Sequence, residues 1–105
     1  MMTQLMPEGT KLGKVGDEII LENDFVRVWR LSLAPGDIQA WHQHDLPYLV
    51  VPLTKGENVM RFASGKVRPT VEAAGDALWR EPGEPHELEN TSDWQYSNLL
   101  IELKK

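Results

Sequence analysis

Short apolar runs separated by turn residues extend along almost the whole chain. The breaks are Asn23-Asp24, Pro35-Gly36, Lys55-Gly56, Ser64-Gly65, Ala74-Gly75-Asp76, Pro82-Gly83 and Thr91-Ser92-Asp93. The runs between them cover residues 18–21, 25–33, 38–44, 48–53, 59–63, 67–73, 77–81, 86–90 and 96–103. Most are rich in β-branched, aromatic and leucine residues, and none has room for an amphipathic helix of about ten residues. The pattern therefore predicts a series of short strands.

Many short strands without crossover helices indicate antiparallel pairing in a sandwich or barrel. Pro52 and Pro69 lie inside strand-like runs, and a proline there lacks a backbone donor, so these segments are expected at an edge or a break. The length of 105 residues predicts one domain, 1–105, with a barrel over 18–103. Residues 1–16 are expected to form a loose N-terminal arm or a lead-in strand.

Charge and composition exclude some classes of partner. Sixteen acidic and eleven basic residues give a net charge of −5, and the basic residues are scattered, so nucleic acid is not an expected partner. No segment approaches the roughly 20 apolar residues of a membrane span, and no signal-like segment is present, so we expect no membrane partner and a cytoplasmic protein. Because the chain has no cysteine, any metal ion must be held by histidine and oxygen ligands.

All three histidines fall in two of the predicted strands. His42 and His44 would point to the same face of a strand, with Cα atoms about 6.5 to 7 Å apart, close enough to share one ion. His86 opens a later strand and would supply a third imidazole if the two strands are neighbours. The alternative is a set of hydrogen-bonded core histidines without a metal ion.

The same residues lie in two stretches that resemble the signature motifs of the cupin superfamily. The first is Gly36, five residues, His42-x-His44, three residues and Tyr48; the second is Gly75-Asp76 and then Gly83, two residues, His86, three residues and Asn90. Together they span residues 36–90. The resemblance implies an all-β cupin fold, a jelly-roll or double-stranded β-helix barrel of antiparallel strands, with a metal inside.

Carried over to this sequence, the resemblance makes His42, His44 and His86 the metal ligands. One divalent transition metal per chain is then expected, with Fe, Zn, Ni and Mn as candidates. The segments ENDFVRVWRLSLAPG, WHQHDLPYLVVPL and IELK are also similar to small single-domain cupins named for a role in β-alanine degradation. That similarity implies metabolism of small amino or carboxylic acids.

Tyr48 is the main departure from the family pattern, which has a glutamate ligand at that position. Without the carboxylate the ion would keep its full charge and an additional open position, which favours anionic substrates. The phenol of Tyr48 is a candidate catalytic group, as a hydrogen-bond donor to the substrate or a proton relay. It can also be a core aromatic residue that fills the space of the glutamate. A second departure is Glu81, where the family has proline.

Several other residues can complete such a site. An inward-facing arginine could bind a substrate carboxylate, and the candidates are Arg27, Arg30, Arg61 and Arg80. One of Trp29, Trp41, Trp79 and Trp94 can line the pocket, and Glu84 or Asp45 can act as a substitute ligand. The run 25–33 has apolar residues on both faces, so a homodimer that covers it is expected.

Three functions are consistent with these features. The first is a small mononuclear metal enzyme, an oxygenase, hydrolase, isomerase or lyase, acting on a small carboxylate or oxygen-bearing metabolite at the three-histidine site. The second is a non-catalytic barrel that binds or senses a metabolite. The third is a structural ion that joins two strands, which fits less well because structural zinc sites usually have four protein ligands.

Overall fold

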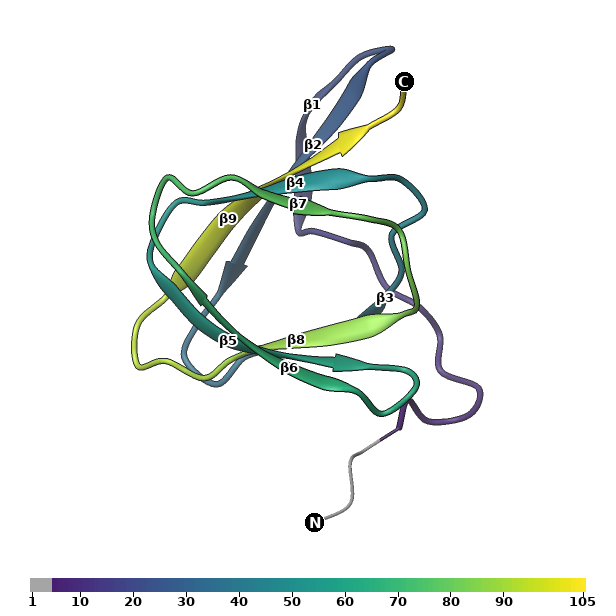
Figure 1. Ribbon diagram of the computed structural model, residues 1–105, viewed down its shortest axis with the longest axis vertical. Coiled ribbons are helices and arrows are strands. Elements are labelled where there is room, and N and C mark those ends of the chain that lie inside the picture. The colour runs from purple at the N-terminus through teal and green to yellow at the C-terminus, as the bar shows by residue number, and fades with distance from the viewer. Residues whose placement is uncertain (1–4) are drawn as a thin grey trace.

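Nine strands in two facing sheets form the protein in a computed structural model that describes residues 5–105 (Figure 1). The strands are β1 Glu18–Glu22, β2 Val26–Leu33, β3 Ile38–His42, β4 Tyr48–Pro52, β5 Gly56–Phe62, β6 Val67–Glu72, β7 Leu78–Arg80, β8 His86–Asn90 and β9 Tyr96–Leu103. One sheet has the order β1-β2-β9-β4-β7 and the other β3-β8-β5-β6, and every neighbouring pair is antiparallel. The predicted all-β antiparallel architecture is confirmed.

The strands lie close to the predicted runs, and only two of their ends differ by more than one residue. β3 ends at His42 and does not reach His44, and β5 begins at Gly56, earlier than the predicted start at residue 59. The two prolines fit their predicted places. Pro52 is the last residue of β4, and Pro69 lies in β6, which forms the edge of its sheet.

The core lies between the two sheets and has two apolar clusters. Leu31, Leu33, Leu88 and Tyr96 form one cluster, and Tyr48, Val50 and Leu100 form the other. The side chains of β9 alternate strictly between buried and half-exposed positions, as expected for a strand with one face on the core. Because β9 pairs with both β2 and β4, this strand joins the two halves of the larger sheet.

The N-terminal segment from residue 5 to residue 17 has no regular strand, but hydrogen bonds attach it to the barrel. The amide of Gly13 donates to the carbonyl of Trp41 at 2.8 Å, and the side-chain amide of Gln39 donates to the carbonyl of Val15 at 2.8 Å. Figure 1 shows this purple segment passing along the side of the barrel near β3. The part of the expected arm at residues 1–4 lies outside the described residues.

Two of the motif glycines permit tight turns between strands. Gly36 and Gly75 have φ angles of 81° and 87°, a left-handed conformation that residues with a Cβ rarely adopt. Asn90, another motif residue, has no exposed surface, and its side-chain amide donates to the carbonyls of Leu33 and Trp94. The side chain of Asn90 therefore links the end of β2 to the turn between β8 and β9, at the end of the barrel opposite the histidines.

Within residues 5–105, no helix is long and apolar enough to cross a bilayer.

Candidate metal centre

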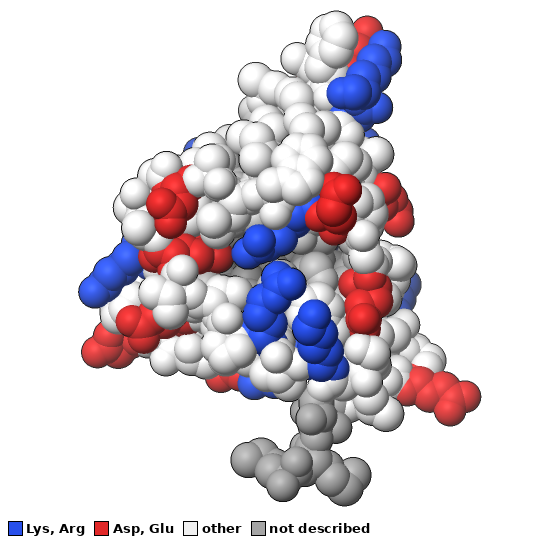
Figure 2. Space-filling view, viewed as in Figure 1, with Lys and Arg blue, Asp and Glu red and all other residues white. Residues whose placement is uncertain are grey.

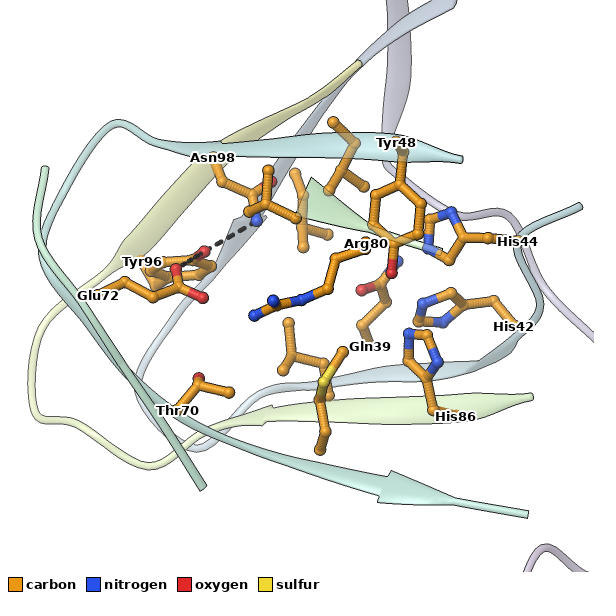
Figure 3. A pocket seen from close by; sticks show the side chains of 15 residues that line it. Gln39, His42, His44, Tyr48, Thr70, Glu72, Arg80, His86, Tyr96 and Asn98 are labelled. Atoms are coloured by element: carbon orange, nitrogen blue, oxygen red, sulfur yellow. Dashed lines mark hydrogen bonds between the residues drawn. The ribbon is translucent and has the colours of Figure 1, made fainter. Parts of the chain in front are cut away.

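Three histidines from β3, β8 and the turn after β3 meet at one end of the barrel interior (Figure 3). His42 ends β3 and His86 begins β8, and these two residues are directly opposite each other in the antiparallel pair. His44 follows two residues after His42. The potential ligand nitrogens of the three side chains all lie within 4.8 Å of one another. In the part of the chain described, no other three histidine or acidic side chains come together in this way.

A β-bulge directs His42 into the barrel. Gln39 pairs with Leu88, but the next paired residue is His42 with His86, so three steps along β3 match two along β8. Gln39 faces the interior, and strict alternation would therefore have turned His42 outward. The additional residue in β3 reverses the alternation and buries His42, which is 2% exposed.

Burial keeps the three imidazoles neutral. Burial lowers the pKa of His44 to about 3, helped by repulsion from His42 and His86, and lowers the pKa of His86 to about 4, helped by repulsion from His42. The pKa of His42 is also lowered by burial, in part offset by its hydrogen bond to the backbone of Ala40. Neutral imidazoles have the free lone pairs that a metal ion requires.

The arrangement fits a transition-metal ion. Nδ1 of His42 lies 2.8 Å from the carbonyl of Ala40, and as the donor of this bond it leaves Nε2 with a free lone pair. Nδ1 of His44 is buried without any hydrogen-bond partner, a state that an ion would relieve. Three imidazole ligands with open positions are typical of catalytic sites rather than structural ones. The three buried histidines are therefore positioned to bind a metal.

No carboxylate in this region replaces the glutamate of the family pattern. Asp45 is exposed, and the carboxylate of Glu84 accepts the amide of Ser64 at 2.7 Å. Glu102 pairs with Tyr48 in register and is buried, but it accepts the indole N–H of Trp29 at 2.6 Å. Among residues 5–105, the group that can share an ion therefore contains histidines alone.

Tyr48 stands beside this group, as the sequence predicted. Its ring stacks on His44 with the centroids 3.7 Å apart and the planes 12° from parallel. Burial raises the pKa of the Tyr48 phenol to about 12, so the hydroxyl is protonated at neutral pH and can donate a hydrogen bond. The catalytic role of Tyr48 stays a prediction.

The four candidate arginines differ in whether they form ion pairs. Arg27 pairs with Glu22 at 3.0 Å, Arg30 with Glu18 at 2.9 Å, and Arg61 with both Glu87 and Glu89. Arg80 makes no ion pair within residues 5–105. Arg80 lies opposite Tyr48 in the sheet, and its side chain reaches into the interior (Figure 3). Its guanidinium donates one hydrogen bond, to the carbonyl of Trp79 at 3.3 Å, and has no ion pair that would compete with an anion.

A mouth of about 320 Å³ connects this end of the interior to the outside. Arg68 and Arg80 line it together with His44, His86 and Tyr48, and Trp79 is the tryptophan at its rim. Figure 2 shows basic side chains near the middle of this face.

Sequence reasoning missed Arg68. It lies on the same face of β6 as Thr70 and Glu72, which also line the interior. The valines of this strand, Val67 and Val71, are on the exposed face, so the apolar alternation predicts the opposite orientation for Arg68.

Comparison with known proteins gives consistent results. Residues 34–105 match the family described as the AraC-like ligand-binding domain. The β-alanine degradation protein BauB of Pseudomonas aeruginosa is 32% identical over 84 residues, which are 80% of this chain and 87% of that protein. A cupin domain from Bordetella pertussis Tohama I is 28% identical, with a TM-score of 0.79, 92% of this chain and all of the other covered.

A more distant solved structure shares the fold alone. It is a conserved protein with a double-stranded β-helix domain from Klebsiella pneumoniae, 21% identical, with a TM-score of 0.66, 95% of this chain and 83% of the other covered. Together these matches confirm both the resemblance and the cupin fold that the motifs implied.

The stability of the metal-free protein should depend on pH through the buried histidines. Their folded pKa values lie below the usual value near 6.5, so the unfolded chain binds more protons as the solution is acidified. The stability gained by keeping these imidazoles neutral is fully present above about pH 6.5. It is lost as the pH falls toward the folded pKa values of about 4 for His86 and about 3 for His44. Urea unfolding between pH 7 and pH 4 should therefore show a smaller loss for His44→Asn than for the unaltered protein. Equal losses would contradict this account.

Proposed function

Because this chain belongs to the AraC-like ligand-binding domain family of the cupin superfamily, we propose that it is a mononuclear metal enzyme acting on a small carboxylate. The observation that carries the proposal is the convergence of three buried, neutral histidines on a space that also receives Arg80 and Tyr48. His42, His44 and His86 hold one divalent transition metal, with Fe, Zn, Ni and Mn as candidates. When bound, such an ion supplies Lewis-acid or redox chemistry, depending on the metal.

The residues around the histidines bind and orient the substrate. Arg80 and Arg68 attract a carboxylate to the mouth, since neither has an ion-pair partner among the described residues. Tyr48 donates a hydrogen bond from its protonated phenol to a substrate oxygen. The neutral ligand set favours an anion, because no carboxylate ligand offsets the charge of the ion.

The name of one relative supports a substrate of this size and charge. BauB of Pseudomonas aeruginosa is named for β-alanine degradation, and β-alanine is a small carboxylic acid. The substrate of the present chain would be a small amino or carboxylic acid, with oxygenation, isomerisation or lyase chemistry as the candidate reactions. A cytoplasmic location stays a prediction.

A non-catalytic barrel that binds or senses a metabolite is the second candidate. The description of the matching family as a ligand-binding domain favours it. Such a barrel would use the same cavity and arginines without turnover. Product formation from a bound carboxylate distinguishes the two functions, since a sensor binds but returns its ligand unchanged.

Metal content is the first test of the enzyme proposal. The protein purified without a histidine tag or chelator should contain about one equivalent of a transition metal per chain by elemental analysis. His86→Ala should lose that metal while its circular dichroism stays that of a folded β-protein. A fully metallated His86→Ala variant would contradict the ligand assignment. The absence of metal after reconstitution would contradict the enzyme.

Replacing Tyr48 with phenylalanine separates its catalytic role from a packing role. Tyr48→Phe keeps the ring on His44 and removes only the hydroxyl, so the metal content should be unchanged. The value of kcat/KM should fall by roughly tenfold or more, the scale of one lost hydrogen bond. Steady-state kinetics on the metal-loaded variant measure this. Unchanged kinetics would leave Tyr48 as a core residue that fills the glutamate position.

We also propose that two copies of the chain associate through the β1–β2 hairpin. All five residues of β1 are exposed, and apolar side chains there include Leu21, 51% exposed, and Phe25, 63% exposed, in the turn between the strands. β1 is also an edge of its sheet, so its outer backbone groups are free to pair. A two-fold contact would cover both features at once.

Charge substitution in this hairpin tests the dimer. Leu21→Asp and Phe25→Asp should convert the dimer to a monomer in sedimentation velocity, because each would bury a charge at the interface. The matched control is Val71→Asp, which alters an 85% exposed residue on β6 at the edge of the other sheet and should leave the dimer intact. A monomeric unaltered protein would refute the proposal.

A further inference from the structure

The end of the barrel interior opposite the histidines is lined by polar side chains with unused hydrogen-bonding capacity. The hydroxyl of Tyr96 donates to the carboxylate of Glu72 at 2.5 Å, and the amide of Asn98 donates to that hydroxyl at 2.9 Å. The side-chain oxygens of Asn98 and Thr70 are buried with no partner. All four residues line the same cavity as the histidines (Figure 3). Buried oxygens of this kind require a partner inside the cavity.

Two opposite charges face this cavity, each without an ion-pair partner. Glu72 is 8% exposed, and within residues 5–105 it makes no ion pair, although a buried carboxylate normally needs a cation or several donors. Arg80 is free as well, and its side chain extends between the histidines and the Tyr96–Glu72 pair (Figure 3). The two groups do not pair with each other in this structure, since no contact within 4.0 Å joins them.

We propose that the Glu72 end of the cavity is a subsite for an ammonium group, so that the ligand is a short amino acid bound as a zwitterion. The proposal rests on the proposed function for the opposite end, where Arg80 and the histidine site take the carboxylate. The ammonium donates to the free oxygen of Glu72 and to the side-chain oxygen of Asn98. Both groups are acceptors at these atoms, so a cationic donor satisfies both and a second carboxylate satisfies neither.

The size of the cavity limits the ligand. The narrow interior cavity has a volume of about 30 Å³, space for about two water-sized groups, so only the ammonium and the carbon that carries it fit there, and the rest of the ligand lies in the mouth. An amino acid with a long or bulky side chain does not fit in that space. The lining between the ends is apolar and includes Leu31, Val50 and Leu100, which suits the short carbon chain between an ammonium and a carboxylate.

Two simpler occupants of the same space are possible outcomes of a test. Ordered water can satisfy the oxygens of Asn98 and Thr70 without any ligand. Arg80 can also turn toward Glu72 and pair with it directly. Neither occupant gives the cavity a preference for an amine over an amine-free acid of the same length.

Calorimetric titration of matched ligand pairs tests the subsite. Glycine, β-alanine and 4-aminobutanoate are each compared at pH 8 with acetate, propanoate and butanoate, using both metal-loaded and metal-free protein. At least one amino acid should bind about tenfold or more tightly than its amine-free partner, the scale of a charge-assisted hydrogen bond. Glu72→Gln should abolish that preference, so that each amino acid binds no more tightly than its amine-free partner. Glu57→Gln, on an exposed residue of β5, is the matched control and should preserve it.

The outcomes separate this inference from the metal proposal. An amine preference in the metal-free protein supports the subsite even if elemental analysis finds no metal. Absence of any preference, or a preference that persists in Glu72→Gln, overturns the subsite while normal metal content leaves the metal proposal intact. A non-additive effect of Glu72→Gln and Arg80→Gln on the unfolding free energy would show that the two charges pair with each other, which also overturns it.

Discussion

The pairing of β3 with β8 is the constraint on which the candidate site depends. This pairing sets His42 directly across from His86, and the bulge in β3 turns His42 inward. β8 also pairs with β5, which places Phe62 on the far side of His86 and closes that flank of the site. Two of the three potential ligands thus come from neighbouring, hydrogen-bonded strands. A site held in this way is preorganised, because the ladder fixes the backbone positions of both residues.

Most of the strands could be predicted from the sequence because turn residues mark their ends and apolar runs mark their bodies. The histidine cluster was indicated by motif resemblance and strand alternation together, although His44 lies beyond the end of β3. The interior positions of Glu72 and Asn58 could not be predicted, since acidic and amide residues in a strand usually face water. Their inward direction follows only from the closure of the two sheets. The lack of an ion-pair partner for Arg80 likewise could not be predicted, because it depends on where every acidic side chain lies.

The interior of this barrel contains many polar side chains. Buried side chains include Asn58, Glu72, Asn98 and Glu102 as well as the histidines, and several of their atoms have no partner in the described residues. A buried polar atom that stays unsatisfied costs a fold about 1–3 kcal/mol relative to a satisfied one. Leucines at these positions would pack without that cost. Polar residues in their place are characteristic of proteins that trade stability for binding.

The histidines and the polar side chains at the opposite end of the cavity come from different strands, so the two groups can vary separately. The histidines belong to β3, the turn after β3, and β8. Thr70, Glu72 and Asn98 belong to β6 and β9. Mutations in β6, an edge strand, can change the shape and charge of the far end without disturbing the register that aligns His42 with His86. A lineage built on this barrel can therefore acquire new ligands by small steps while its histidine cluster is inherited unchanged.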